Sequence, residues 1–172
     1  AIHLDFGRAY AEAGNPDLAI TEFKKAIALN PRLPEAHYCL GASYLLSQGQ
    51  VGFPEAVKEF HQELGLNPND YFSLAQLGYV AFTERRFAEA ETSLKRAAAL
   101  DPRNPDNPLL LGQVYIQLDH TADAEVALRR AIALTTDLSR NHYQVQRAHY
   151  LLGRLLVQTG HINEARQEMQ IS

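Results

Sequence analysis

Cysteine, tryptophan and methionine are almost absent from this 172-residue chain, which has one Cys, one Met and no Trp. With Cys39 alone, neither an internal disulfide nor a cluster of thiolate metal ligands can form. Long apolar runs are missing too. No stretch approaches the roughly 18 residues of a membrane-spanning helix, and no charged-then-apolar leader opens the chain. We therefore expect a soluble protein. The residues leave its compartment open, although they favour the cytoplasm over the periplasm.

An excess of positive charge is also lacking. The chain carries 16 Lys and Arg against 20 Asp and Glu, a net charge of −4, and its isoelectric point is near 6.0. A general nucleic-acid binder needs a basic surface that displaces the counterions of the phosphate backbone. The composition therefore disfavours nucleic acid as a partner.

What the chain does contain is one series of residues that returns five times. The series has a glycine, an aromatic residue, a small residue, a large apolar residue and a second small residue, and three copies end on proline. The copies are Gly7, Tyr10, Ala19, Phe23, Ala26, Pro31; Gly41, Tyr44, Ala56, Phe60, Glu63, Pro68; Gly78, Ala81, Ala90, Leu94, Ala97, Pro102; Gly112, Tyr115, Ala124, Leu128, Ala131; and Gly153, Leu156, Ala165, Met169.

The spacing inside each copy predicts two packed helices. Ala19, Phe23 and Ala26 are four and three residues apart, so they share one helical face. Gly7 lies in an apolar helical pattern, where glycine costs roughly 1 kcal/mol relative to alanine. Its fivefold recurrence indicates a contact that a side chain would block. The pairs Asn30-Pro31, Asn67-Pro68 and Asp101-Pro102 each predict a helix end, since the residue before proline avoids helical dihedrals.

The repeat glycines are separated by 34, 37, 34 and 41 residues. A base period of 34 with helix-turn-helix units is typical of tetratricopeptide repeats. The chain resembles this family over essentially its whole length, and its short repeats with Asn-Pro junctions favour a bacterial source. Departures include Glu63 in an alanine slot and Thr136 in place of the fourth proline, while the family's tryptophan slot holds His3, His37, Leu74, Pro108 and His149. The resemblance implies an all-α fold, a right-handed α-solenoid of antiparallel helix pairs.

We expect a single array over 1–172, with repeats at 1–33, 34–70, 71–104, 105–138 and 139–172. Because the chain starts and stops inside helices, we also expect it to be a fragment of a longer protein. Three extra residues should make 49–54 a protruding, mobile loop. Seven extra residues, almost two helical turns, predict one long helix near 138–159 that projects beyond its neighbours. The remaining helices are expected near 2–13, 16–29, 35–48, 70–84, 87–100 and 121–134, with a short helix from about 107 and a last helix from 162.

The resemblance also implies a concave groove lined by the first helix of each repeat. Its middle should be apolar and aromatic, which suits peptide docking. The alternative, that individual rings pack as ordinary core, stays open. The groove residues carried over by resemblance are Arg8, Tyr38, Leu45, Phe72, Gln76, Tyr79, Phe82, Gln113, Ile116, Gln117, Arg147, Tyr150 and Arg154.

Arginines follow one face of the long fifth-repeat helix. Arg140, Arg147 and Arg154 are seven residues apart, with Tyr143 and Tyr150 beside them. We hypothesise that this row receives carboxylates of an acidic segment or chain terminus, since guanidinium groups bind carboxylate in a bidentate way. The alternative is a solvated or internally paired face. A family subset grips chaperone C-termini with lysine and asparagine, but the matching slots hold Leu4 and Arg8, so that ligand is not expected.

Catalytic and metal motifs are not found. The chain has no phosphate loop, no serine elbow and no His-Glu-x-x-His pattern. His3, His37 and His149 occupy one slot of separate repeats, too far apart to share a metal. We therefore expect no enzyme, no cofactor and no metal, but a scaffold that binds a protein or peptide. Two alternatives stay open: a regulatory or substrate-recruiting arm of a larger enzyme, and weak self-association through uncapped ends.

Overall fold

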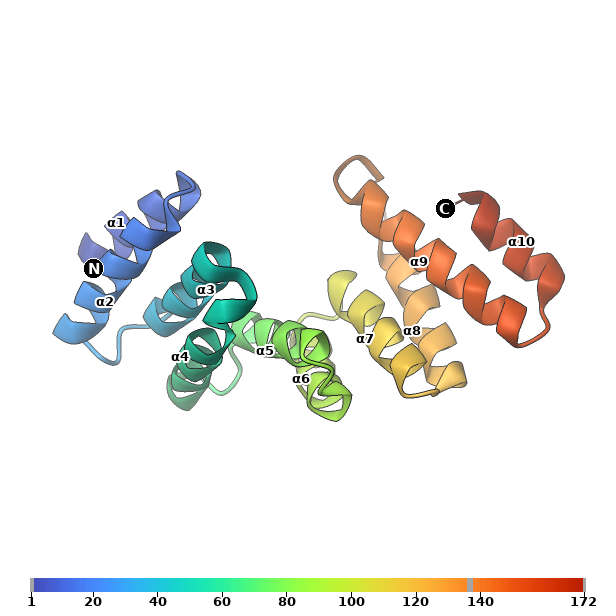
Figure 1. The fold of residues 1–172 in the computed structure, drawn as a ribbon, viewed down its shortest axis with the longest axis horizontal. Helices are drawn as coiled ribbons and strands as arrows, with labels where there is room; N and C mark the ends of the chain where they lie inside the picture. The colour runs from blue at the N-terminus through green and yellow to red at the C-terminus, as the bar shows by residue number, and fades with distance from the viewer. Residues whose placement is uncertain (1, 136–137, 172) are drawn as a thin grey trace. The chain divides into compact units, whose positions relative to one another are not determined.

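The computed structural model describes the backbone of residues 2–135 and 138–171, and the side chains of residues 2–135 and 144–171. Within these residues the chain is helical and contains no strand (Figure 1). The helices are α1 (Ile2–Glu12), α2 (Pro16–Leu29), α3 (Ala36–Gln48), the short 3-10 helix η1 (Gly49–Gly52), α4 (Phe53–Leu66), α5 (Tyr71–Thr83), α6 (Phe87–Leu100), α7 (Asp106–Gln117), α8 (Thr121–Leu134), α9 (Leu138–Gln158) and α10 (Ile162–Ile171).

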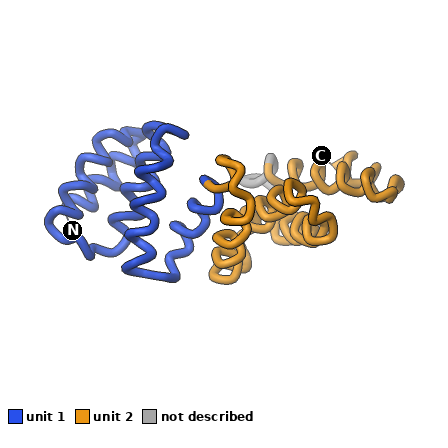
Figure 2. Tube along the Cα trace, turned by 60° about the horizontal axis from the view of Figure 1, so that its bottom comes forward, with its two compact units in different colours: residues 1–80 blue, residues 81–172 orange. Residues whose placement is uncertain are grey.

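The chain forms two compact units, which we describe separately. Unit 1 is Ala1–Val80 and unit 2 is Ala81–Ser172, with the boundary inside α5 (Figure 2). In unit 1, α2 packs against both α1 and α3, and α3 also packs against α4. In unit 2, α7 packs against α6 and α8, and α9 packs against α8 and α10. In unit 1, α2 and α3 thus each lie between their predecessor and their successor, and in unit 2 the same holds for α7, α8 and α9. This arrangement confirms the predicted all-α solenoid of antiparallel helix pairs.

The repeat glycines lie where the two helices of a pair come closest. A Cβ atom at Gly7 would lie 2.4 Å from Cε1 of Phe23, and one at Gly41 would lie 2.7 Å from Cε1 of Phe60. At Gly112 the nearest atom would be Cδ2 of Leu128, also at 2.7 Å. Because atoms cannot approach this closely, the predicted contact that a side chain would block is confirmed.

The Asn-Pro and Asp-Pro junctions end helices as predicted. Asn30 and Asn67 have extended backbone angles after α2 and α4. The side-chain oxygen of each accepts the backbone N–H two residues later, from Arg32 at 3.1 Å and from Asn69 at 3.2 Å. This local turn satisfies a donor that the helix has left behind. Asp101 accepts the backbone N–H of Arg103 at 3.3 Å in the same way. This turn accounts for the amide or carboxylate residue before the repeat prolines Pro31, Pro68 and Pro102.

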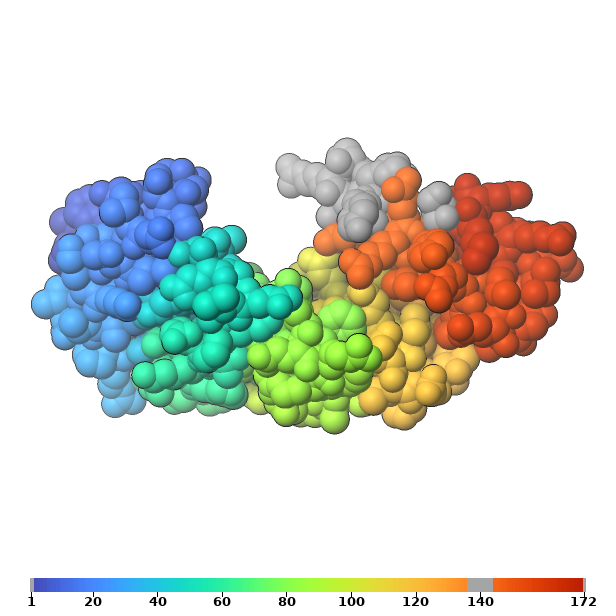
Figure 3. All heavy atoms as spheres, viewed as in Figure 1, coloured from blue at the N-terminus to red at the C-terminus, as the bar shows by residue number. Residues whose placement is uncertain are grey.

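The two insertions take different forms. Residues 49–52 fold into η1, and Gly52 is buried so close to α3 that a Cβ would lie 2.6 Å from the carbonyl oxygen of Tyr44. The predicted loop is therefore a short helix whose last residue packs against α3, while Gly49, Gln50 and Val51 are exposed, Val51 at 80%. The prediction of one long helix is confirmed by α9, which has 21 residues and lies beside α10 (Figure 3). Val145 in its added turns is buried.

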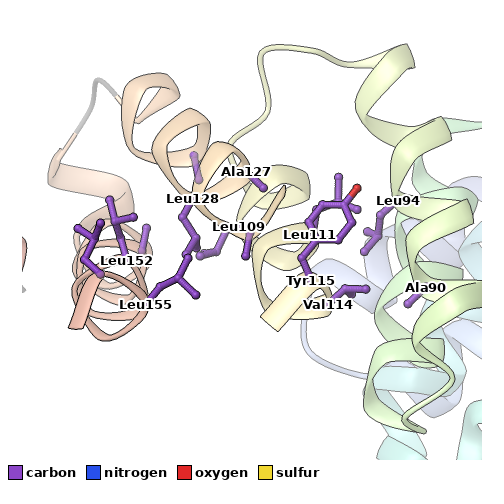
Figure 4. Packing of buried hydrophobic residues seen from close by; sticks show 14 of the residues in the cluster. Ala90, Leu94, Leu109, Leu111, Val114, Tyr115, Ala127, Leu128, Leu152 and Leu155 are labelled. Atoms are coloured by element: carbon purple, nitrogen blue, oxygen red, sulfur yellow. The ribbon is translucent and has the colours of Figure 1, made fainter. Parts of the chain in front are cut away.

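Each unit has its own apolar core. In unit 1, Phe23 and Phe60 are the largest fully buried side chains. In unit 2, leucines and alanines from α6 to α9 converge in one continuous cluster (Figure 4). These cores bury one face of each helix and leave the opposite faces free to form surface cavities.

Candidate functional site

The largest described cavity of unit 1 lies along α3 and α5, and we call it the unit 1 cavity. It has a volume of about 460 Å³, and η1 supplies part of its wall. Four predicted groove residues, Tyr38, Leu45, Gln76 and Tyr79, come together here. The complete lining is Tyr38, Ala42, Leu45, Leu46, Gly49, Gln50, Phe53, Gln76 and Tyr79.

The unit 1 cavity is uncharged and rich in rings. Neither α3 nor α5 contains an Asp, Glu, Lys or Arg residue. The Tyr38 ring lies 5.3 Å from the ring of Phe72, and burial raises the pKa of the Tyr38 hydroxyl. Tyr79 is exposed and stands edge-on to Phe53 at 6.5 Å. Covering such a surface with an apolar side chain of a partner lowers the free energy.

A second cavity of unit 1 continues along α3 to α1. Its volume is about 390 Å³, and it shares Tyr38, Ala42 and Leu46 with the unit 1 cavity. Arg8, another predicted groove residue, lines it and pairs with Glu35. Burial raises the pKa of the nearby Cys39 thiol, an effect that Arg8 partly opposes. The thiol is thus favoured over the thiolate.

Unit 2 has a smaller cavity of about 170 Å³ between α7 and α9, which we call the unit 2 cavity. Its lining is apolar apart from three amides and one guanidinium group. Five predicted groove residues line it: Phe82, Gln113, Ile116, Gln117 and Arg154. Leu151, Leu155 and Gln158 complete the lining.

The remaining predicted residues lie next to these cavities. Arg147 Nη2 donates a hydrogen bond to Oε1 of Gln113 at 2.6 Å. The guanidinium of Arg154 lies over the Tyr150 ring, 5.8 Å from its centroid. Phe72 is exposed beside Tyr38. The predicted arginine row is thus described for Arg147 and Arg154, whereas Arg140 and Tyr143 lie outside the described side chains.

The sequence reasoning missed a recurring His–Glu pair. The Nδ1 atoms of His3, His37 and His149 lie 2.5, 2.6 and 2.6 Å from Oε2 of Glu22, Glu59 and Glu168 on the second helix of the same repeat. Each of these glutamates directly precedes the repeat's large apolar residue. In the two repeats with Leu74 and Pro108 in the histidine slot, that position holds Ser93 and Ala127. The histidine and the glutamate thus occur together in three repeats and are both replaced in the other two. This correlation in the sequence could have revealed the pairs.

The described residues also lack two other kinds of feature. No group of three or more His, Cys, Asp or Glu side chains is placed to hold a metal ion. No described helix is both long and apolar enough to span a membrane. The histidines that invite a metal interpretation instead pair with glutamates inside their own repeats.

Models of the tetratricopeptide repeat family match nearly the whole chain. A TPR repeat model matches residues 7–49, and tetratricopeptide repeat models match 40–108, 81–144 and 146–170. No curated protein sequence matches the chain significantly. The family assignment therefore depends on the repeat models.

Solved structures of similar fold include MamA and PilF. A crystal structure of MamA covers 96% of this chain and 91% of its own, with a TM-score of 0.82 and 22% identity. MamA of Desulfovibrio magneticus RS-1, from residue 41 to the end, covers 98% and 90%, with a TM-score of 0.83 and 21% identity. PilF of Pseudomonas aeruginosa covers 99% and 73%, with a TM-score of 0.80 and 22% identity. At such identities the likeness concerns the fold alone.

The phased glycines, the stacked helix pairs and the consecutive family matches lead to one assignment. This chain belongs to the tetratricopeptide repeat family.

Proposed function

We propose that this chain is a non-catalytic module that binds a peptide segment of a partner protein along the first helices of its repeats. Tetratricopeptide repeat proteins act as protein-interaction scaffolds, and membership of that family supports the general class. The thirteen groove residues, with Arg8, Tyr38 and Tyr79 in unit 1 and Gln113 and Arg154 in unit 2, are the proposed contacts.

The unit 1 cavity is the observation that carries this proposal. It is a hollow of about 460 Å³ with an exposed leucine, Leu46, and an exposed ring, Tyr79, at its surface. Large rigid side chains bury much area at low entropic cost and dominate binding energies. Gln76 adds an amide that can pair with a peptide backbone. These features suit a segment that inserts an uncharged apolar side chain.

We further propose that the partner segment carries acidic residues. In unit 2 the predicted groove includes Arg147 and Arg154 on α9, a helix with no Asp or Glu over residues 138–158. Cationic surfaces attract anionic partners and raise their association rates. This proposal concerns unit 2 alone.

An affinity capture with matched variants tests the role of the unit 1 cavity. Leu46 and Leu29 are both exposed, at 69% and 75%, but only Leu46 lines the cavity. We expect Leu46→Asp to lose partners that the wild type and Leu29→Asp retain, because a buried carboxylate without a partner is costly. Tyr79→Ala should lose the same partners. Retention of every partner by folded Leu46→Asp would refute the proposal.

Self-association is a second candidate function, favoured by an exposed stripe on α1. Ile2, Phe6 and Tyr10 are four residues apart and 62%, 51% and 38% exposed. The equivalent positions of the other four repeats are all buried: Ala36, Leu40, Tyr44; Ser73, Leu77, Ala81; Asn107, Leu111, Tyr115; and Ala148, Leu152, Leu156. These positions are therefore buried in four repeats, whereas in the first repeat their side chains are exposed.

Light scattering across a range of protein concentrations tests this candidate. If the stripe mediates self-association, the mass should rise with concentration for the wild type and stay at one chain for Phe6→Asp. Leu29→Asp serves again as the control, since its leucine is exposed on α2 outside the stripe. A wild-type mass of one chain at every concentration would exclude the candidate.

A further inference from the structure

Helix α9 contains basic but no acidic residues, whereas α8 and α10, its neighbours in the sequence, contain both. Over residues 138–158 it has three arginines and no acidic residue, in a chain of net charge −4. In α7 the one charged residue is Asp106, whose carboxyl group is hydrogen-bonded to Gln144 and has a pKa raised by burial. Past Asp106, neither α7 nor α9 contains an Asp or Glu residue, so the arginines of α9 are the charges that these two helices contribute there.

Arg147, Tyr150 and Arg154 share one face of α9, because they are three and four residues apart. The ring of Tyr150 holds the Arg154 guanidinium by a cation–π contact at 5.8 Å. Gln113 accepts one hydrogen bond from Arg147. A guanidinium has five N–H donors, so both groups keep donors for a ligand.

Three other arginines of the chain are paired with glutamates. Arg8 pairs with Glu35, Arg86 with Glu84 and Glu89, and Arg129 with Glu125 and Glu164. In the described part of the chain, neither Arg147 nor Arg154 faces a carboxylate. Arg147 and Arg154 thus lie beside the unit 2 cavity without a carboxylate partner among the described residues.

We propose that Arg147 and Arg154 bind two carboxylate side chains of one extended partner segment, with an apolar residue between them seated in the unit 2 cavity. This inference rests on the proposed function, because it specifies the peptide that unit 2 takes. The apolar residue would contact Ile116 and Leu151 in the cavity lining. Gln117, also in the lining, would pair with the peptide backbone.

The separation of the arginines sets the spacing of the acids. Seven helical residues rise about 10.5 Å along α9, at roughly 1.5 Å each. A polyproline II segment has three residues per turn and advances about 3.1 Å per residue, so acidic residues three positions apart lie on one side of it and span about 9 Å. One terminal carboxylate can reach only one of the two arginines. The geometry therefore favours a Glu-x-x-Glu segment over a chain terminus.

Fluorescence anisotropy with a labelled synthetic peptide tests this inference on the whole chain. The probe is acetyl-Gly-Ser-Glu-Leu-Ser-Glu-Gly-Ser-amide, whose blocked ends carry no terminal charge, and its counterpart has glutamine for both glutamates. We expect the glutamate peptide to bind about tenfold more tightly than the glutamine peptide. Its affinity should also fall when salt is raised to about 0.3 M, because salt screens exposed charges.

Two variants assign the effect to residues. Arg147→Gln with Arg154→Gln should weaken the glutamate peptide about tenfold, while Arg166→Gln, an exposed arginine on α10 outside the cavity, should leave its affinity unchanged. Circular dichroism checks that each variant is folded. Equal affinity for both peptides, no binding of either, or no effect of the double variant would overturn the inference. The Leu46→Asp capture separately tests the proposed function, so the two failures are distinguishable.

Discussion

Glu63 shows how one residue that breaks the repeat pattern can be explained by its neighbours. It stands where other repeats have Ala26, Ala97 or Ala131, and it is almost fully buried. Its two carboxylate oxygens accept the backbone N–H groups of Glu35 at 3.0 Å and Tyr38 at 3.3 Å. Both donors belong to the start of α3, where unsatisfied N–H groups favour a negative charge.

The start of α3 needs this help because it lacks a cap of its own. Glu35, at the N-cap position, has a left-handed backbone and makes no side-chain capping hydrogen bond. At the start of α5, in contrast, Asp70 accepts the N–H of Ser73 at 2.7 Å. A carboxylate from α4 thus replaces the local cap that the second repeat is missing.

We predict that Glu63→Ala destabilises the protein by about 1–3 kcal/mol, although alanine is the usual residue in this slot. The substitution would leave two partly buried N–H groups at the start of α3 without their carboxylate acceptor. Chemical denaturation measures the change in the free energy of unfolding, with Gln62→Ala, an exposed position on the same helix, as control. A neutral Glu63→Ala would show that water satisfies these donors instead.

The large side chain that faces the repeat glycine differs between helix pairs in its burial and flexibility. A Cβ atom at Gly41 would lie 2.7 Å from Cε1 of Phe60, a fully buried ring, and 3.1 Å from the carbonyl oxygen of Ala56. At Gly153 the nearest atom would be Cγ of Met169, also at 2.7 Å, but this flexible side chain is partly exposed. The repeat glycine therefore faces a rigid ring, Phe60, in α4 but a flexible side chain, Met169, in α10.

We predict that Gly41→Ala destabilises the chain by about 1–3 kcal/mol, because overpacking outweighs the helix propensity that alanine gains. Gly153→Ala should change stability by less than about 1 kcal/mol, since Met169 can move aside. Thermal unfolding of both variants measures the difference. Equal loss in the two would mean that backbone contacts, rather than the side chains, limit the approach.

The η1 segment shows why glycine positions alone can mislead. Gly49 and Gly52 suggested a protruding loop from sequence, yet only Gly49 has a positive φ, of 56°. Gly52 is instead required by the close approach of the Tyr44 carbonyl. Both residues are glycines, but they are required for different reasons. The reason at Gly52 is a contact with Tyr44 that cannot be inferred from the sequence.

At the scale of the whole molecule, each unit has its own core. The cluster around Phe23 and Phe60 belongs to unit 1, and the cluster around Leu128 and Leu152 belongs to unit 2. In repeat proteins, stability is approximately a sum of repeat terms and contacts between neighbours. Damage should therefore stay close to the repeat in which it occurs.

We predict that Phe23→Ala, which should cost about 3–5 kcal/mol, speeds amide exchange chiefly in α1 to α3 and leaves α8 to α10 unchanged. Hydrogen–deuterium exchange with mass spectrometry measures each helix separately. As the reciprocal control, Leu128→Ala should loosen α7 to α9 and leave α1 and α2 protected. A uniform rise in exchange throughout either variant would show that the whole chain unfolds as one cooperative unit.

The sequence by itself determined the helices, the repeat and the family, because these depend on spacing along the chain. Glycines 34 residues apart, small and large residues on one helical face, and Asn-Pro junctions placed the helix bounds to within two residues in most cases. The long α9 followed from its added heptad in the same way. Period and dihedral preference are local properties, so they can be read without coordinates.

Only the tertiary structure decided which side chains meet. It grouped Tyr38 with Tyr79 around one cavity and Gln113 with Arg154 around another, paired the histidines with glutamates about twenty residues away, and placed Glu63 at the start of α3. Each of these contacts joins different helices. Their distances depend on how the helices pack, and packing is fixed by the shape of both partners rather than by the order of residues in either.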